Sequence, residues 1–428
     1  MTYNEAIQYI NATPKFGKTP GLHRIQKLLA LLGNPQKQLK FVHVAGTNGK
    51  GSVCSCIHSI LMDAGFRTGL FISPHLKRLS ERIRVGGTEI SEREIAEYID
   101  FISRKADIMT RSGDDAPTEF DMLTAMAMLH FNKVACDIVV LEVGIGGIID
   151  STNIIDENES LLSVITSIGF DHMEYLGETL PEIAAKKAGI IKNNHTTVVY
   201  PAEDSVMDVF ERTCTEKNAR IIKLEESAVK IKGFGINGTS FDFFGFGDLQ
   251  IKLLGKYQVY NAALAVLACL TLRDKGYEIN DESIRTGLIN AIWPGRFEIV
   301  NRTPLVIIDG AHNTEGASAL LDGLSVYFNG RKLTFICACM ADKDPMALFE
   351  PFASIAKRFI TITPGTKRAM PGEQLMEKIK AFHGDVVFKN NVREALDYAV
   401  STSAPDDLIC AFGSLYFMGE VRDYFGLT

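Results

Sequence analysis

The stretch HVAGTNGKGS, residues 43–52, decides the fold, because it follows an apolar run and precedes a helical pattern. Its glycines let the backbone turn sharply and point N–H groups inward, and the helix that follows adds its positive end, a combination that binds phosphate. The usual phosphate-binding loop reads G-x-x-x-x-G-K-[ST], whereas here Gly51 stands between Lys50 and Ser52. We predict a variant phosphate-binding loop in which Lys50 reaches the outer phosphates and Ser52 can ligate Mg²⁺.

Length, composition and charge bound the possible functions. The 428 residues exceed the size at which one hydrophobic core keeps growing, so two domains are expected. The net charge of −7 does not favour nonspecific attraction to nucleic acid, and no nucleic-acid partner is expected. The N-terminus has no basic start followed by an apolar core, and no apolar run approaches the roughly 20 residues of a membrane helix. We therefore expect a cytoplasmic protein without a membrane partner.

Apolar, β-branched runs alternate with helical patterns along the chain, which indicates parallel βαβ architecture. The expected strands lie in residues 39–46, 68–73, 136–144 and 161–169, and in a second cycle 304–310, 332–340, 358–364 and 406–413. The fold class is α/β: a mostly parallel P-loop-type sheet domain with a small β-hairpin region at 239–255, plus a second Rossmann-like α/β domain. Pro294 and Gly295 break a helix, and Pro304 is expected to precede the first strand of the second domain. We place the domains at 1–296 and 297–428.

Polar and glycine-rich clusters follow six of the expected strands. Because ligands of open α/β sheets bind beyond the carboxyl ends of the strands, we expect these clusters to face one cleft. They are GTNGKGS at 46–52, SPH at 73–75, EVGIGG at 142–147, GFDH at 169–172, DGAHN at 309–313 and GS at 413–414. The stretch GFGING at 233–238 matches a dinucleotide fingerprint, but a hairpin-like pattern follows it instead of a helix, so we discard it.

Several of these strand ends carry charged or hydroxyl side chains that suit nucleotide chemistry. Glu142 ends an apolar strand, where a carboxylate is costly unless it meets a cation, and with Ser73 and His172 it suits Mg²⁺. Asp309 suits ribose hydroxyls, and His312 can hold a carboxylate or a phosphate. The plainer alternatives are a solvated strand end for Glu142, and for Arg296, in the junction WPGRFE, a surface arginine instead of one that projects into the cleft.

Together these motifs resemble the folylpolyglutamate synthase and dihydrofolate synthase family, within the Mur-type ligases. The resemblance runs from TPGLHRIQKLLALLGNP to AFGSLYFMGEVR and includes HVAGTNGKGS, ISPHL, TEFD, EVGIGG with DSTN, SIGFDHMEYLGETL, KAGIIK, WPGRFE, DGAHN, DKD and GSLY. It implies an ATP-dependent acid–amino-acid ligase that joins L-glutamate to a folate or pteroate carboxylate through an acyl phosphate. The substrates implied are tetrahydrofolate, dihydropteroate or both, and a monomer is implied.

The resemblance also implies roles for individual residues. ATP contacts are implied for Gly46, Thr47, Asn48, Gly49, Lys50, Gly51 and Ser52, with Asn261 at the adenine, Arg296 at the triphosphate and Asp309 at the ribose. Two Mg²⁺ sites are implied at Ser52, Ser73, Glu142, His172 and Lys187, the last carbamylated by CO₂. The pterin site is implied at Thr118, Phe120 and Asp150, and the glutamate site at His312 and Ser414. The catalytic set is then Lys50, Lys187, His172 and Arg296.

Two positions depart from the family pattern and keep other functions open. Ile148 stands where the family usually has arginine, and Lys186 stands where it commonly has glutamate. These departures favour, as an alternative, a related Mur-type ligase that joins glutamate to a different carboxylate. A cell-wall Mur ligase would place a separate domain before the loop, for which about 45 residues are too few. A P-loop phosphotransferase is the alternative of another class, and a non-catalytic ATP switch would have little use for paired metal ligands.

Overall fold

The protein is described by a computed structural model that covers residues 1–15, 17–366 and 368–427. These residues form two compact units. The first unit comprises Met1–Val229 and Asn261–Ala291, and the second comprises Lys230–Tyr260 and Ile292–Thr428. This division groups residues 230–260 with the later segment, whereas the sequence placed them before a boundary at 296–297. That domain boundary stays a prediction.

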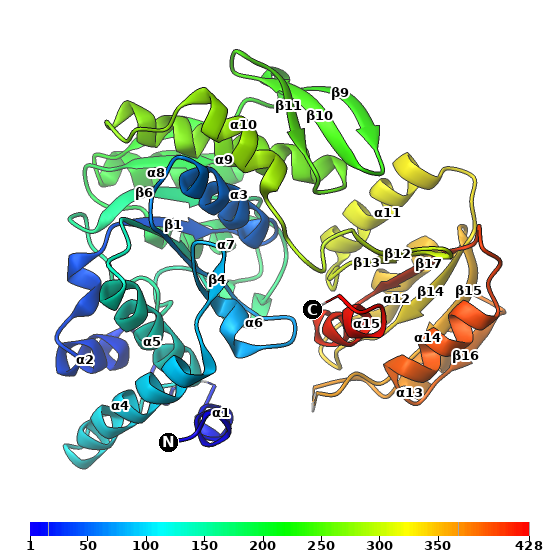
Figure 1. Cartoon of the computed structure of the whole chain (residues 1–428), viewed down its shortest axis with the longest axis horizontal. Coiled ribbons are helices and arrows are strands. Elements are labelled where there is room, and N and C mark those ends of the chain that lie inside the picture. The colour runs from blue at the N-terminus through cyan, green and yellow to red at the C-terminus, as the bar shows by residue number, and fades with distance from the viewer. Residues whose placement is uncertain (16, 367, 428) are drawn as a thin grey trace. The chain divides into compact units, whose positions relative to one another are not determined.

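The first unit is built on an eight-stranded sheet with the order β4-β3-β2-β5-β1-β6-β7-β8 (Figure 1). The strands β2, β5, β1, β6, β7 and β8 run parallel to one another. At the edge beyond β2, β3 pairs antiparallel with β2, and β4 pairs antiparallel with β3. The four strands predicted for this part of the chain are confirmed as β1, β2, β5 and β6, which are neighbours in the sheet. The bounds are β1 Phe41–Ala45, β2 Thr68–Phe71, β3 Ile83–Val85, β4 Thr88–Glu89, β5 Ile138–Glu142, β6 Ser160–Ile165, β7 Thr196–Val199 and β8 Arg220–Lys223.

Helices cover this sheet, and the helix that follows the phosphate loop is deeply buried. Helix α3 (Lys50–Asp63) starts directly after Gly49, whose φ of 84° lies in the left-handed region, and every residue from Gly51 to His58 is buried. Helix α10 (Asp281–Asn290) packs on α3 so closely that a Cβ at Gly287 would lie 2.4 Å from the Ile60 Cα. Helix α3, which begins at the phosphate loop, is therefore packed tightly against α10.

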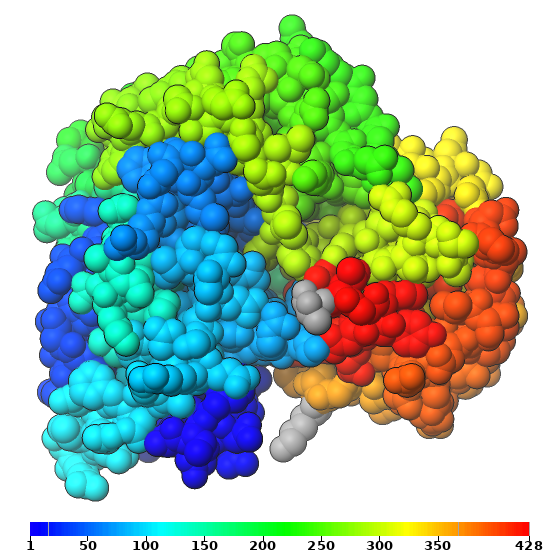
Figure 2. Space-filling view, viewed as in Figure 1, coloured from blue at the N-terminus to red at the C-terminus, as the bar shows by residue number. Residues whose placement is uncertain are grey.

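Four more helices of the first unit, α1, α2, α4 and α5, share one hydrophobic core with the sheet. Their core joins α1, α2, α4 and α5 to the sheet through Phe41, Phe71 and Leu141. The space-filling view shows α1 (dark blue) beside the cyan surface of α4 (Figure 2). The bounds are α1 Tyr3–Ala12, α2 His23–Leu31, α4 Glu92–Arg111, α5 Glu119–Lys133, α6 Met173–Leu176, α7 Leu180–Lys187, α8 Asp204–Glu216 and α9 Lys256–Asp274, with short 3-10 turns at Pro35–Gln38, Leu79–Arg82, Ala188–Ile190 and Glu226–Ala228. The start of α9, up to Tyr260, belongs to the second unit.

The second unit contains a three-stranded antiparallel sheet, β9 (Lys230–Gly235), β10 (Gly238–Phe243) and β11 (Phe246–Ile251). The predicted hairpin is confirmed as β10–β11. GFGING forms the end of β9 and the turn into β10, where Gly235 pairs with Gly238, so the rejection of the fingerprint is confirmed.

The larger sheet of the second unit has six strands in the order β12-β13-β17-β14-β15-β16, all parallel except β12. The four predicted strands are confirmed, but Pro304 does not precede the first strand, because β12 already pairs with β13 before it. The bounds are β12 Glu298–Arg302, β13 Leu305–Ile308, β14 Leu333–Cys337, β15 Ala356–Thr361, β16 Val386–Phe388, β17 Leu408–Phe412, α11 Thr314–Phe328, α12 Pro345–Phe349, α13 Gly372–Ile379, α14 Val392–Ser401 and α15 Met418–Tyr424, with 3-10 turns at Glu350–Phe352 and Leu415–Phe417.

Phenylalanine side chains dominate the core of this unit: Phe335 stacks on Phe359 and meets Phe352 and Phe412 edge-on.

Within residues 1–15, 17–366 and 368–427, no helix combines the length and the apolar character needed to cross a bilayer.

The close contact between α10 and α3 can be tested by substitution at Gly287. Gly287→Ala would drive a methyl group into the backbone of α3, and we expect it to lower the free energy of unfolding by about 2 kcal/mol or more. Thr286→Ala, one residue earlier and only half-buried, is the matched control, with an expected change within about 0.5 kcal/mol. Urea unfolding measures both, and equal stability of the two variants would contradict the close contact.

Candidate active site

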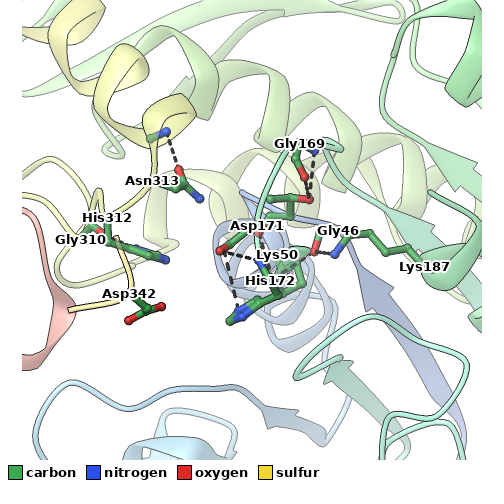
Figure 3. A network of polar contacts seen from close by, with 12 residues as sticks. Gly46, Lys50, Gly169, Asp171, His172, Lys187, Gly310, His312, Asn313 and Asp342 are labelled. Carbon is green, nitrogen blue, oxygen red and sulfur yellow. Dashed lines mark hydrogen bonds and ion pairs between the residues drawn. The ribbon is translucent and has the colours of Figure 1, made fainter. Parts of the chain in front are cut away.

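The phosphate loop is held by the segment that follows the neighbouring strand β6. The Thr47 hydroxyl lies 3.0 Å from both the nitrogen and the carbonyl oxygen of Gly169 (Figure 3). The Thr166 hydroxyl donates to the Asn48 carbonyl at 2.7 Å. The two segments approach so closely that a Cβ at Gly46, whose φ is 151°, would lie 1.7 Å from the Thr166 hydroxyl oxygen. Only glycine fits at that position.

Two lysines converge on the same carbonyl oxygen of this loop. The Lys50 ammonium donates to the Gly46 carbonyl at 3.1 Å and to that of Thr47 at 3.1 Å. The Lys187 ammonium, at the end of α7, donates to the Gly46 carbonyl at 2.7 Å (Figure 3). Lys187 is only 4% exposed. The pair concentrates positive charge at the helix N-terminus where phosphate is expected to bind.

Asn261, predicted to contact the adenine, lies against the same loop. It belongs to α9 and is buried, and a Cβ at Gly49 would lie 2.6 Å from its side-chain oxygen. Asn261 is therefore placed beside the loop, whatever it contacts in a nucleotide complex.

The predicted metal ligands come from neighbouring strand ends. Glu142 is 3% exposed at the end of β5, and one of its carboxylate oxygens accepts from the Ser73 backbone N–H, just after β2, at 2.8 Å. Ser52 is buried in the first turn of α3. The His172 residue has a φ of 50°, and its imidazole lies 3.9 Å from the Asp171 carboxylate (Figure 3).

The donors in this set fit Mg²⁺ chemically, because they supply one carboxylate, two hydroxyls and an imidazole and leave room for phosphate and water oxygens. No group of three or more His, Cys, Asp or Glu side chains that could hold a metal ion occurs among the described residues. A metal at this place would therefore depend on the serine hydroxyls and on oxygens from substrates. The metal site stays a prediction.

Two of the residues predicted for the pterin site, Phe120 and Asp150, lie against Gly144. A Cβ at Gly144 would lie 2.8 Å from the Phe120 ring and 3.0 Å from the Asp150 carboxylate. Thr118 caps α5 and accepts from the Asp121 N–H at 3.2 Å. The loop after β5 thus passes between an aromatic face and a carboxylate, and only a glycine leaves space for both.

Asp150 is a buried carboxylate surrounded by donors. One oxygen accepts from the Ile145 N–H at 2.8 Å, and the other accepts from the Thr152 N–H at 3.0 Å and the Thr152 hydroxyl at 2.5 Å. Burial raises the pKa of the Asp150 carboxyl, and the hydrogen bonds from Thr152, Ile145 and Gly144 oppose that rise.

Ile148 and Lys186, the two departures from the family pattern, are joined by a backbone hydrogen bond. The Ile148 N–H donates to the Lys186 carbonyl at 3.1 Å, and a Cβ at Gly189 would lie 2.3 Å from the Ile148 side chain. The side chains of Ile148 and Lys186 are both exposed. The loop after β5 is therefore fixed against the end of α7, while the substituted side chains face solvent.

In the second unit, Asp309 follows β13 and is 4% exposed. Its carboxylate accepts from the backbone N–H groups of Phe297 and Ala311, each at 2.7 Å, and lies 3.4 Å from the Tyr257 hydroxyl. Burial raises the pKa of Asp309, and the positive charge of Arg296 opposes it. A Cβ at Gly310 would lie 2.4 Å from the Arg296 guanidinium, so this unit brings together two predicted nucleotide contacts.

The predicted glutamate-binding residues also lie close together in the second unit. The strands β13 and β17 are parallel neighbours, and the Gly413 N–H donates to the Ala311 carbonyl at 2.9 Å. His312 and Ser414 are the next residues along each segment. An imidazole nitrogen of His312 lies 2.7 Å from the Gly310 carbonyl, and the Ser414 hydroxyl accepts from the Tyr416 N–H at 3.2 Å.

The predicted residues thus lie in both units: the loop, Asn261, the metal ligands and the pterin set in the first, and Arg296, Asp309, His312 and Ser414 in the second. Sequence reasoning missed the residues that support them. Thr166 directly follows β6 and lies beside the phosphate loop, and its only sequence signal is polarity at that strand end. Asp171, beside His172, lies in the GFDH cluster but received no role. Thr152 lies in the quoted DSTN motif but received no role.

Comparison with known proteins supports one family over nearly the whole chain. Residues 44–269 match the Mur ligase middle domain, and residues 295–415 match the Mur ligase, glutamate ligase domain. The dihydrofolate synthase/folylpolyglutamate synthase of Bacillus subtilis is 34% identical over 98% of both chains.

Solved structures give the same result. Mycobacterium tuberculosis folylpolyglutamate synthase complexed with ADP aligns with a TM-score of 0.90 and 30% identity, over 99% of this chain and 98% of that one. A folylpolyglutamate synthase complex with AMPPCP and folate aligns with a TM-score of 0.86 and 30% identity, over 100% of both chains. The resemblance inferred from the motifs is confirmed: the chain belongs to the Mur ligase family of ATP-dependent ligases, in the branch of the folylpolyglutamate and dihydrofolate synthases.

Proposed function

We propose that the protein joins L-glutamate to a folate-type carboxylate in an ATP-dependent reaction that passes through an acyl phosphate. The substrate is tetrahydrofolate, dihydropteroate or both. The observation that carries the proposal lies in the first unit: the phosphate loop, the buried Glu142 and the loop with Asp150 follow the neighbouring parallel strands β1 and β5, with Lys187 against the phosphate loop and Phe120 against Gly144. ADP, AMPPCP and folate in the related complexes support the same substrates here.

The proposed reaction has two steps. A carboxylate oxygen of the folate attacks the γ-phosphorus of ATP, the bond to the ADP oxygen breaks, and an acyl phosphate forms. The amino group of glutamate then attacks the acyl carbon, phosphate leaves, and the nitrogen loses its proton as the amide forms. Lys50 and the loop N–H groups stabilise charge on the phosphates, and Arg296 adds positive charge at the triphosphate.

The remaining residues bind and orient the substrates in this proposal. Asp309 holds the ribose, Asn261 contacts the adenine, and His312 with Ser414 binds the incoming glutamate. Phe120 offers its ring to the pterin, flanked by Thr118 and Asp150. Mg²⁺, at two sites held by Ser52, Ser73, Glu142, His172 and modified Lys187, would neutralise developing negative charge on the phosphate oxygens. We place the working protein in the cytoplasm as a monomer, as the family resemblance implies.

Carbamylation of Lys187 forms part of the proposal. The neutral amine would add CO₂ to give a carbamate and release one proton, which converts a cation into an oxygen donor for a metal. The carbamate nitrogen keeps one hydrogen, so it can still donate to the Gly46 carbonyl that the ammonium contacts at 2.7 Å. The burial of Lys187 supports the modification, because a buried lysine readily loses its proton and becomes nucleophilic.

A second candidate is a ligase that joins glutamate to a different carboxylate. It is favoured by Ile148 and Lys186, which replace the charges usual in the family beside the loop after β5. Because both side chains are exposed, they can affect a substrate only at the outer rim of this loop.

An activity assay with defined acceptors separates these functions. With purified protein, ATP and Mg²⁺, we expect phosphate release only when glutamate and either dihydropteroate or tetrahydrofolate are both present. Mass spectrometry should show a product heavier than the acceptor by one or more glutamyl residues. Phosphate release or phosphoryl transfer without glutamate would instead indicate a phosphotransferase, and inactivity with both acceptors would favour the ligase of a different carboxylate.

Substitution of Lys50 tests the phosphate loop. Lys50→Ala removes a charge that contacts the transferred phosphate in the proposal, and we expect kcat to fall about 100-fold or more. The melting temperature should stay within about 2 °C, because the lysine reaches only carbonyls of its own loop. A variant with nearly unchanged kcat would show that the loop does not hold the reacting phosphates.

Substitution of Lys187 tests the modification. We expect Lys187→Ala to lose activity and to regain part of it with acetate or propionate, which can occupy the space of the carbamate. Lys186→Ala, at the adjacent exposed position, is the matched control and should keep wild-type activity without any additive. Wild-type activity of Lys187→Ala without an additive would refute the carbamate, and so would an inactive variant that no carboxylic acid rescues.

A further inference from the structure

We propose that His43 is a positioning residue, which acts through the Thr152 hydroxyl to fix the Asp150 carboxylate and the loop that packs on Phe120. This inference rests on the proposed function, in which Asp150 and Phe120 lie at the pterin site. His43 belongs to β1, three residues before Gly46, so it links the strand of the phosphate loop to the acceptor site. The proposed reaction assigns no role to His43.

The contacts form an unbroken chain. A His43 ring nitrogen, Nε2, lies 2.9 Å from the Thr152 hydroxyl oxygen, and that hydroxyl lies 2.5 Å from one oxygen of Asp150. The other oxygen of Asp150 accepts from the Ile145 N–H at 2.8 Å. His43 and Thr152 are fully buried and Asp150 is 7% exposed, so water does not compete for these bonds.

The direction of each bond follows from the number of protons available. The Thr152 hydroxyl has one proton, and an ionised Asp150 can only accept. The hydroxyl therefore donates to Asp150 and must accept from His43, which places the His43 proton on Nε2. Burial, together with the charge of Lys192, holds the pKa of His43 well below its ordinary value, which agrees with a neutral ring.

The other ring nitrogen shows that this histidine is not simply a satisfied core residue. Its Nδ1 is buried and has no hydrogen-bond partner in the part of the chain that the structure describes. Leaving a polar atom unpaired in a core lowers stability, and an apolar side chain would avoid that cost. The bond to Thr152 is the interaction that an apolar residue could not make.

The hydrogen bond from His43 affects how firmly Asp150 and the loop after β5 are held. Without a donor at His43, the Thr152 hydroxyl could rotate away from Asp150. The carboxylate would then lose its shortest hydrogen bond and would hold the Gly144–Ile145 segment less firmly. Because Gly144 packs against Phe120, loosening this segment disturbs the surface offered to the pterin, whereas the phosphate loop keeps its own contacts to Thr166 and Gly169.

The test is a double-mutant cycle on the full-length protein, with steady-state kinetics for the folate acceptor and for ATP. We expect His43→Leu and Thr152→Val each to raise KM for the acceptor about tenfold, while KM for ATP stays within about twofold. The double variant should be no worse than either single one, because both remove the same chain of bonds. His43→Gln and Thr152→Ser, which keep a donor and a hydroxyl, should restore most of the affinity.

Two kinetic results would overturn the proposal: effects of the single variants that multiply in the double one, or an acceptor KM that does not change in His43→Leu. A reading independent of catalysis is ¹⁵N NMR of labelled histidine in the wild-type protein, with His43→Gln identifying the signal. A neutral ring with its proton on Nε2 supports the proposal, and a proton on Nδ1 refutes it. If the wild-type protein ligates glutamate to no folate, the proposed function fails, whereas the NMR result still decides the hydrogen-bond chain.

Discussion

The parallel pairing of β1 with both β5 and β6 is the constraint on which the first unit depends. Parallel strands end at the same edge of a sheet, so the phosphate loop, Glu142 and the segment before His172 emerge side by side. The close approach of Gly46 to Thr166 then fixes the loop against its neighbour. A shift of β6 along β1 would separate Thr47 from Gly169 and leave the loop without its support.

The second unit also places polar residues at the ends of neighbouring parallel strands. Strands β13 and β17 are parallel neighbours, and the residues after them are Asp309, His312 and Ser414. Asp309 is held by two backbone N–H groups, one of them from Phe297, the residue directly after Arg296. The arginine and the carboxylate therefore lie close together inside this unit, which their proposed roles at one nucleotide require.

Much of this arrangement could be predicted from the sequence because buried parallel strands are continuous apolar runs and their ends are polar. The runs that became β1, β5, β13 and β17 have this form. The sequence does not predict strands β12 and β16, because both are only partly buried and β16 has just three residues, so apolar character does not mark them. The contact between His43 and Thr152 could not be predicted, because 109 residues separate them and no periodic pattern joins a strand to a loop.

The two lysines at Gly46 connect the proposed chemistry to the ligand-free geometry. Two ammonium groups that donate to one carbonyl oxygen must lie close together, and their mutual repulsion is weakly screened where Lys187 is buried (Figure 3). A triphosphate would draw Lys50 toward its own oxygens, and carbamylation would replace the positive charge of Lys187 with a negative one. Each change relieves the same repulsion, so either one alone leaves less of it for the other to remove. Lys187 as a permanent cation would instead hold the phosphates directly and leave the metal without its oxygen donor.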